Sequence, residues 1–239
     1  MTVKDASLST LQRADGSAKC EHDGYCVIGA VNGPIEVMRR DELPEEAAIE
    51  INVRPAVGVG SPTERHLETL LQSTLRRIIR VETYPRTLIQ ITLQVLSVPD
   101  VKPTPVSFLA VLPALLQTSL LALLSASIPL TTTYTATACA ATSSGDLIST
   151  MSLTSAATLA SFHVFAFTAQ GDLLLAESEG SFDIGIWNKV YLTAEEICRG
   201  KPTDAVEDII MDQQGNSLQE RLQAAVQSKV EADRRWKSS

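Results

Sequence analysis

The chain has 239 residues, of which 44% are hydrophobic and 20% are charged, and its formal net charge is −8 at pH 7. This length and composition are those of a globular protein that can bury a substantial core. The acidic balance argues against a free-standing nucleic-acid-binding domain, because such domains normally carry a net positive charge.

The four cysteines are scattered, with no CxxC pair and without the density of a disulfide framework. We therefore expect reduced, buried side chains and no metal site at Cys20, Cys26, Cys139 and Cys198. The N-terminus has no basic segment followed by an apolar one, so no secretory signal is expected and the predicted compartment is the cytosol or nucleus.

Short strands dominate the first 60 residues. The predicted strands cover residues 8–13, 17–22, 25–31 and 49–53, with turns at 14–17, 22–24 and 32–34. Glycine, proline, asparagine and aspartate gather in these turns, while apolar residues alternate between them, which is the pattern of a β-meander. The mixed-charge segment 39–46 is interpreted as a solvated loop.

The clearest predicted helix begins after Ser61, which is an N-cap residue followed by Pro62 and by Glu64, the partner in a capping box. Apolar residues then recur at helical spacing on one face: Leu67, Leu70, Leu71, Leu75, Ile78 and Ile79. At about 100° per residue, Arg65, Arg76 and Arg80 fall together on the opposite face. A break at 84–87 and a strand at 88–96 follow.

No charged residue occurs between Lys102 and Asp146, and the most apolar part of this stretch is 106–130. Such a run is long enough for a bilayer-spanning helix, but it also fits a helix buried at the centre of a globular fold. Its interior serines and threonines, and the lack of flanking basic or aromatic clusters, favour the buried helix. A start near Leu112 places Pro113 in the first turn, where its missing N–H costs least.

The second half predicts strands at 131–142, 159–168 and 173–177, the last two forming a hairpin, and a helix at 183–199. The alternation of 159–168 predicts that both faces of this strand are covered and that His163 is a core or interface histidine. The charged tail predicts two amphipathic helices at 204–211 and 218–230. We therefore predict an α+β fold with helices packed on mixed sheets, a main domain at 1–200 and a helical tail at 201–239.

Several segments together resemble the RNase PH family, and most closely the RNase PH-like ring subunits of the eukaryotic RNA exosome. They are residues 14–18, 31–36, 42–44, 51–58, 84–87, 93–96 and 121–130 (ADGSA, VNGPIE, ELP, INVRPAVG, YPRT, LQVL and LALLSASIPL). The resemblance covers roughly the first 200 residues and implies an RNase PH-like fold (ribosomal protein S5 domain 2-like). It implies two βαβ-type halves, mixed sheets and packed helices, and assembly into a six-membered ring around a channel.

The family's reaction is phosphorolysis of the RNA 3′ end. It uses a Gly-Thr-Arg motif at the start of the central helix to hold phosphate, and aspartates in the following strand region. Here residues 102–112 contain no such motif, and no carboxylate occurs from Leu147 to Gln170, where Thr150 and Ser161 stand near the aspartate positions. We therefore expect no catalytic residue, no metal and no cofactor.

The resemblance implies that Arg86, in the segment YPRT, faces RNA; the alternative is that it locks the helix-to-strand turn against Glu82. Arg76 and Arg80 are predicted to add to a positive channel wall, or else to lie on an ordinary solvated helix face.

Three functions remain open. The first is a non-catalytic ring subunit that supports 3′–5′ RNA processing and degradation. Its expected partners are other RNase PH-like ring subunits, S1/KH-type cap subunits, a hydrolytic exoribonuclease and single-stranded RNA, with no membrane. Its expected location is the nucleus and nucleolus and also the cytoplasm. The alternatives are an active phosphorolytic exoribonuclease and, more remotely, a membrane-anchored protein.

Overall fold

The computed structural model describes residues 3–40, 42–99, 108–142, 147–149, 159–199 and 217–235. The chain divides into an N-terminal unit (Lys4–Pro99 and Ala114–Thr133) and a C-terminal unit (Met1–Val3, Asp100–Pro113 and Tyr134–Ser239). The predicted boundary between residues 200 and 201 lies outside the described residues and stays a prediction.

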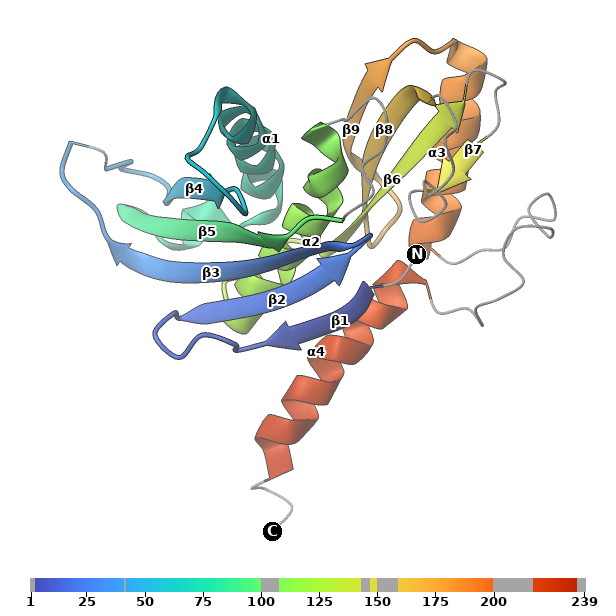
Figure 1. The fold of residues 1–239 in the computed structure, drawn as a ribbon. Helices are drawn as coiled ribbons and strands as arrows, with labels where there is room; N and C mark the ends of the chain where they lie inside the picture. The colour runs from blue at the N-terminus through green and yellow to red at the C-terminus, as the bar shows by residue number, and fades with distance from the viewer. Residues whose placement is uncertain are drawn as a thin grey trace. The chain divides into compact units, whose positions relative to one another are not determined.

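Within the N-terminal unit, a five-stranded sheet has the order β1-β2-β3-β5-β4 (Figure 1). Its strands are β1 (Val3–Leu8), β2 (Gly16–His22), β3 (Tyr25–Glu36), β4 (Ala48–Arg54) and β5 (Thr87–Ser97). β3 runs antiparallel to both β2 and β5, whereas β4 runs parallel to β5. A parallel pair needs a crossover, and the crossover here is a helix, which gives the predicted βαβ unit.

This crossover helix is α1 (Pro62–Ile78), and its start confirms the predicted capping box. The side chain of Ser61 caps the helix, and the Ser61 backbone N–H donates to the Glu64 carboxylate at 2.7 Å. The Ser61 hydroxyl also donates to this carboxylate, and this side-chain bond, with the backbone bond as a smaller contribution, keeps the pKa of Glu64 below its ordinary value. Four residues of the predicted apolar stripe are buried in the helix: Leu67, Leu71, Leu75 and Ile78. The short 3₁₀ helix η1 (Val81–Thr83) follows.

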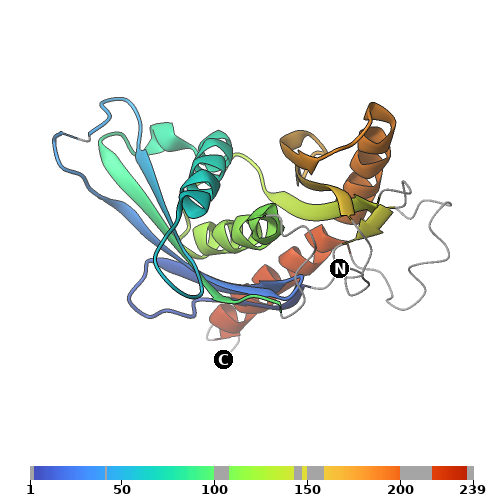
Figure 2. The ribbon, with the colours of Figure 1, turned by 45° about the horizontal axis from the view of Figure 1, so that its top comes forward.

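The central helix α2 (Leu112–Ser125), preceded by the 3₁₀ helix η2 (Phe108–Val111), begins at the predicted residue. Figure 2 shows α1 and α2 on the same face of the N-terminal sheet. The approach of α2 to the sheet is very close, because a Cβ atom built on Gly16 of β2 would lie 2.2 Å from the Ala126 nitrogen. The polar residues Gln117, Thr118 and Ser119 are buried, and the two hydroxyls bond to carbonyls of the preceding turn.

The run Phe108–Ser125 is long and apolar enough to pass as a membrane span by length and composition, but 78% of it is buried. Burial on nearly all sides is the property of a core helix, so it supports the interpretation favoured by the sequence.

Two predicted strands of the N-terminal unit differ from the structure by several residues. The predicted strand at 8–13 is wrong, because β1 ends at Leu8 and the chain then folds back onto Ser17, whose Oγ accepts from the Leu11 N–H at 2.8 Å. The predicted stop at 32–34 is also wrong, because β3 continues to Glu36 through a β-bulge. Gly33 permits this continuation, since its φ is +145° and its N–H donates to Asp15 at 2.8 Å.

In the C-terminal unit, the described strands form an antiparallel sheet of order β7-β6-β8-β9, covered by α3. Its elements are β6 (Tyr134–Thr142), β7 (Leu147–Ser149), β8 (Leu159–Thr168), β9 (Leu173–Gly180), α3 (Ile184–Arg199) and α4 (Leu218–Arg234). The predicted hairpin is confirmed as β8–β9, and the predicted helices at 183–199 and 218–230 correspond to α3 and α4. The predicted helix at 204–211 lies outside the described residues.

An aromatic cluster fills the space between this sheet and α3. Phe165 and Phe167 of β8 are fully buried and contact Tyr191 of α3, while Trp187 of α3 contacts Phe165. Nearly every residue of β8 is buried, so the prediction that both faces of this strand are covered is confirmed. All four cysteines are free and buried, as predicted.

Candidate functional site

The three arginines predicted to contact RNA lie around one short loop of the N-terminal unit. The loop, residues 42–47, is bonded to the turn between α1 and β5, because the Ala47 N–H donates to the Val81 carbonyl at 2.9 Å. The Arg86 N–H lies 3.1 Å from the Leu43 carbonyl and 3.3 Å from the Glu46 carbonyl. The backbone therefore fixes the positions from which these side chains project.

Arg86 has the left-handed φ of +63°, which is uncommon for a residue with a side chain. Its Nε lies 3.3 Å from the Glu42 carboxylate, while its side chain remains 69% exposed. The carboxylate partner is thus Glu42 and not Glu82, the residue named in the alternative interpretation. Since a guanidinium has five donors, one ion pair at Nε leaves donors for a phosphate.

Arg76 projects from the last turn of α1, and its Nη2 is ion-paired with Glu46. Arg80 is not on α1, because the helix ends at Ile78 and Ile79 pairs with Leu130 in a β-bridge. The shared helix face predicted for Arg76 and Arg80 is therefore wrong. The Arg80 side chain is exposed, and among the described residues it makes no hydrogen bond or ion pair.

The charges around this loop cancel. Residues 42–47 and 76–86 together carry four arginines and four glutamates. The region is therefore not a cationic surface, and long-range attraction of RNA is not expected from it. Individual guanidinium groups can instead contact single phosphates at short range. At Arg86 and Arg76, such a phosphate would compete with the carboxylates of Glu42 and Glu46.

The start of α2 is apolar where the family carries its phosphate-binding motif. Leu109 is 2% exposed and Leu112 is fully buried. Residues 101–107 lie outside the described residues, as does Thr150. Among the residues that the structure describes, no group of three or more histidine, cysteine, aspartate or glutamate side chains is arranged to hold a metal ion.

Ser161, the other residue near the family's aspartate positions, belongs to a buried hydrogen-bond chain that the sequence did not reveal. Its Oγ lies 2.9 Å from His163 Nε2, and His163 Nδ1 lies 2.8 Å from the Ser178 hydroxyl of β9. Burial lowers the pKa of His163, so the ring is neutral and bonds both hydroxyls. The only sequence signal was the spacing of Ser161 and His163, which places both on one face of β8.

We expect the neutral state of His163 to make stability depend on pH. The folded pKa lies below the unfolded value of about 6.5, so the unfolded chain binds more protons as the pH falls below 6.5. The contribution of the neutral His163 ring to the free energy of unfolding is therefore fully present above pH 6.5. Below that pH, this contribution should fall by up to about 1.4 kcal/mol per pH unit. Urea unfolding at pH 7.5, 6.5 and 5.5 measures this loss. The exposed His66 serves as control: His163→Gln should reduce the slope, while an equal reduction by His66→Gln would contradict the assignment.

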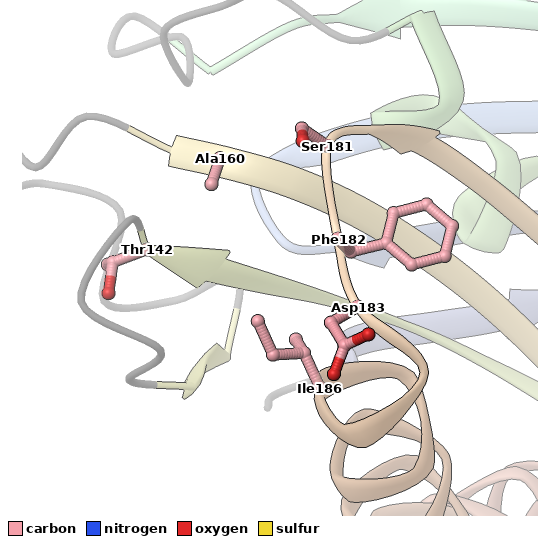
Figure 3. A pocket seen from close by; sticks show the side chains of 6 residues that line it. All are labelled: Thr142, Ala160, Ser181, Phe182, Asp183 and Ile186. Carbon is pink, nitrogen blue, oxygen red and sulfur yellow. The ribbon is translucent and has the colours of Figure 1, made fainter.

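A cavity of about 480 Å³ is lined by residues of β6 and β8 and by the segment that leads from β9 into α3 (Figure 3). Its lining combines apolar side chains, among them Ile186, with hydroxyl groups and the Asp183 carboxylate. Asp183 accepts from the Gly185 N–H at 3.3 Å, so the carboxylate contributes to the start of α3. Phe182 packs edge-on against His163, with ring centroids 4.8 Å apart. None of the described residues that line the cavity has a cationic side chain that would hold phosphate.

Comparison with known proteins gives a consistent set of relatives. A family model described as the 3′ exoribonuclease family (RNase PH), domain 1, matches residues 5–129. The "Exosome complex component RRP46" of Saccharomyces cerevisiae is 44% identical over 91 residues, 38% of this chain and 41% of the relative. The "Exosome complex exonuclease RRP46 homolog" of Oryza sativa subsp. japonica is 31% identical over 138 residues, 58% of this chain and 54% of the relative.

These alignments span about half or less of the relatives' own length. A solved structure extends the likeness: the crystal structure of rice Rrp46 superposes with a TM-score of 0.68 and 26% identity, over 82% of this chain and 91% of that one. The likeness therefore includes both units of the chain, although the family model covers mainly the first.

Proposed function

The chain belongs to the RNase PH family of 3′ exoribonucleases, and from this premise we propose that it is a non-catalytic ring subunit of an RNA exosome. The names of its relatives, which describe exosome components, support the assembly. The observation that carries the non-catalytic role is the burial of two apolar residues where the chain enters α2: Leu109 in η2 and Leu112 at the start of α2. An apolar helix start cannot neutralise a phosphate dianion as a guanidinium does.

In this role the chain forms part of the ring wall and supports 3′–5′ processing and degradation of single-stranded RNA by the complex. Its proposed partners are other RNase PH-like ring subunits, S1/KH-type cap subunits and a hydrolytic exoribonuclease. Its proposed locations are the nucleus and nucleolus and also the cytoplasm. Arg86, Arg76 and Arg80 are the proposed RNA contacts.

The test of the non-catalytic role is a phosphorolysis assay. The purified chain, incubated with single-stranded RNA and inorganic phosphate, should release no nucleoside diphosphate above the level without phosphate, because it lacks the phosphate-holding arginine. Chromatographic separation of the products measures the release. An active family member with the Gly-Thr-Arg motif is the positive control, and phosphate-dependent release from the lone chain would overturn the proposal.

That outcome would support the second candidate, an active phosphorolytic exoribonuclease. The word "exonuclease" in the name of the rice relative favours it. The same assay therefore decides between the two functions.

The RNA contacts have a separate test. We expect Arg86→Ala and Arg80→Ala each to weaken binding of single-stranded RNA about fivefold, since a lost charge-assisted contact at an exposed site costs roughly 1 kcal/mol. Each should also lower the slope of log affinity against log salt concentration by about 0.7. Arg76→Ala should have a smaller effect, because Glu46 already holds its Nη2 atom.

Arg65→Ala is the matched control for this series. Arg65 is also on α1, is 85% exposed and lies 3.9 Å from Glu68. Fluorescence anisotropy with a labelled RNA, on the ring assembled with each variant, measures the affinity. Equal losses of RNA affinity for Arg65→Ala and Arg86→Ala would mean that the RNA responds to surface charge in general and not to a specific site. Unchanged affinity for every variant would contradict all three proposed RNA contacts.

A further inference from the structure

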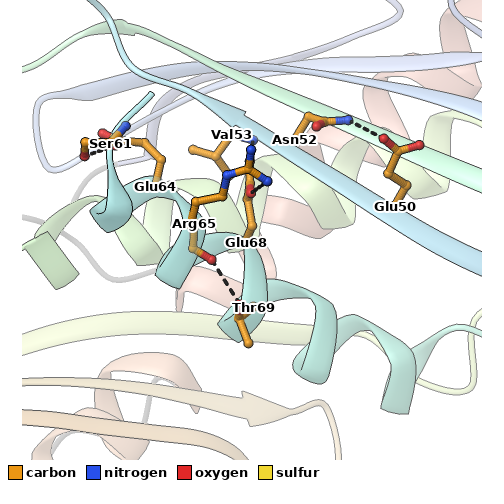
Figure 4. Close-up of polar contacts among 8 residues, drawn as sticks. All are labelled: Glu50, Asn52, Val53, Ser61, Glu64, Arg65, Glu68 and Thr69. Carbon is orange, nitrogen blue, oxygen red and sulfur yellow. Dashed lines mark hydrogen bonds and ion pairs between the residues drawn. The ribbon is translucent and has the colours of Figure 1, made fainter. Parts of the chain in front are cut away.

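The edge strands β4 and β9 differ in whether other groups bond to their outer sides. In the N-terminal unit, the outer edge of β4 is covered by side chains of α1. The Glu68 carboxylate accepts from the Val53 N–H at 2.8 Å (Figure 4), and the Gln72 amide donates to the Ile49 carbonyl at 2.9 Å. An edge whose backbone groups are bonded in this way cannot pair with another chain, which is a common protection of sheet edges.

On the edge strand β9 of the C-terminal unit, the backbone groups of Ala176 and Ser178 have no such cover among the residues that the structure describes. The sheet order β7-β6-β8-β9 places β9 last, and no described strand pairs with its outer side. Unpaired N–H and C=O groups along an edge strand are a template for adding a further strand.

The register of the β8–β9 hairpin identifies these groups. Antiparallel residue pairs alternate between those that exchange hydrogen bonds and those whose backbone groups point away from the partner strand. The Ser181 N–H donates to the Ala160 carbonyl at 3.0 Å, so this pair is of the bonded kind. Counting back by the observed register, in which Ser178 faces His163 and Ala176 faces Phe165, the backbone groups of Ala176 and Ser178 point outward.

Exposed apolar side chains lie at both ends of this edge. Leu173, at the start of β9, is 41% exposed, and Phe182 and Ile184, which follow its end, are 40% and 71% exposed. A strand that paired along β9 would therefore reach apolar surface at each end, and burial of that surface would add to the backbone hydrogen bonds.

The negative charge of β9 indicates which kind of strand could pair with its outer edge. Glu177 and Glu179 lie on it, and Asp172 and Asp183 flank it. In a two-fold pairing with a second copy centred on Ser178, Glu177 of one copy would face Glu179 of the other, and like charges directly opposite are unfavourable. A strand with lysine or arginine at those positions is complementary instead.

We propose that the outer edge of β9 receives a basic strand of a different RNase PH-like ring subunit, which extends the C-terminal sheet across the subunit boundary. This inference rests on the proposed ring function and adds the surface and the chemistry of the partner. The backbone N–H of Ala176 donates to the incoming strand, and Glu177 and Glu179 select a basic partner over a second copy.

The test uses the full chain, co-expressed with the other RNase PH-like ring subunits of the same organism and purified by a tag on this chain. Ala176→Pro removes one outward N–H and leaves the pairing with β8 intact, because proline is tolerated at such edge positions. We expect it to weaken binding of one ring neighbour at least tenfold. Ala176→Thr, which keeps the N–H and favours strands, is the matched control and should bind like the wild type.

The double variant Glu177→Lys/Glu179→Lys should weaken binding of the same neighbour, and it leaves the backbone N–H groups of β9 in place. It therefore serves as the test if thermal melting shows that Ala176→Pro is unfolded. Unchanged binding of every neighbour by the folded variants would overturn the inference. A homodimer of the isolated chain that Ala176→Pro disrupts would overturn the choice of partner. If the wild type binds no ring subunit at all, the proposed function itself fails, and the two failures are thereby distinguished.

Discussion

Gly16→Val is expected to destabilise the N-terminal unit by at least about 3 kcal/mol, since overpacking against atoms that cannot move is among the most costly core changes. A Cβ atom at Gly16 would lie 2.2 Å from the Ala126 nitrogen and 2.5 Å from the Ala122 carbonyl oxygen. Both atoms are backbone, and the Ala126 N–H donates to that same carbonyl at 3.0 Å. The new side chain can be accommodated only if the end of α2 moves away from β2.

Gly60→Ala is the matched control, because no atom lies within 4 Å of its added Cβ and its φ is not positive. It should change stability by less than about 1 kcal/mol, in the stabilising direction, through the unfolded state. Urea unfolding followed by far-ultraviolet circular dichroism measures both variants. Equal midpoints for Gly16→Val and the wild type would show that α2 does not pack on β2 at this distance.

Phe165→Ala is expected to cost about 3–5 kcal/mol, the range for removal of a fully buried aromatic side chain. The ring is fully buried, and its centroid lies 5.7 Å from that of Trp187 and 5.9 Å from that of Tyr191, both edge-on. The space left behind lies between a sheet and a helix that are fixed by many other contacts. It can therefore collapse only in part, which places the cost in this upper range.

Phe182→Ala provides the control in the same unit, since Phe182 is 40% exposed and its loss should cost roughly 1–2 kcal/mol. Trp187 packs directly on Phe165, so tryptophan fluorescence during urea unfolding reports on this cluster. A loss for Phe165→Ala no larger than that for Phe182→Ala would mean that the cluster is loosely packed.

Local sequence signals predicted several elements correctly. The capping box at Ser61 and Glu64 acts within one helical turn, so its residues alone determine the start of α1. The same holds for the turn at Asp23 and Gly24, whose φ values of +50° and +80° suit the short loop between β2 and β3. The start of α2 at Leu112 followed from the chemistry of Pro113 in a first turn.

The wrong predictions concern segments whose conformation depends on a contact with a residue distant in sequence. β3 passes through Gly33 because Asp15, 18 residues earlier, accepts its N–H. Arg80 does not share a helix face with Arg76, because α1 has ended and the neighbouring Ile79 pairs with Leu130, far along the chain. Periodicity cannot foresee either contact, since it treats each segment as continuous until a local breaker appears.

The family, the α+β class and the absence of the Gly-Thr-Arg motif could be predicted from the residues alone, because they depend on residue identity and on order along the chain. The folded chain was needed to identify three further features: the ion pairs of Arg86 with Glu42 and of Arg76 with Glu46, the hydrogen bonds of His163 with Ser161 and Ser178, and the cover of one sheet edge by α1. Each of these is a pairing of polar groups across the fold. Such pairings depend on strand register and helix placement, which are set by packing of the whole unit.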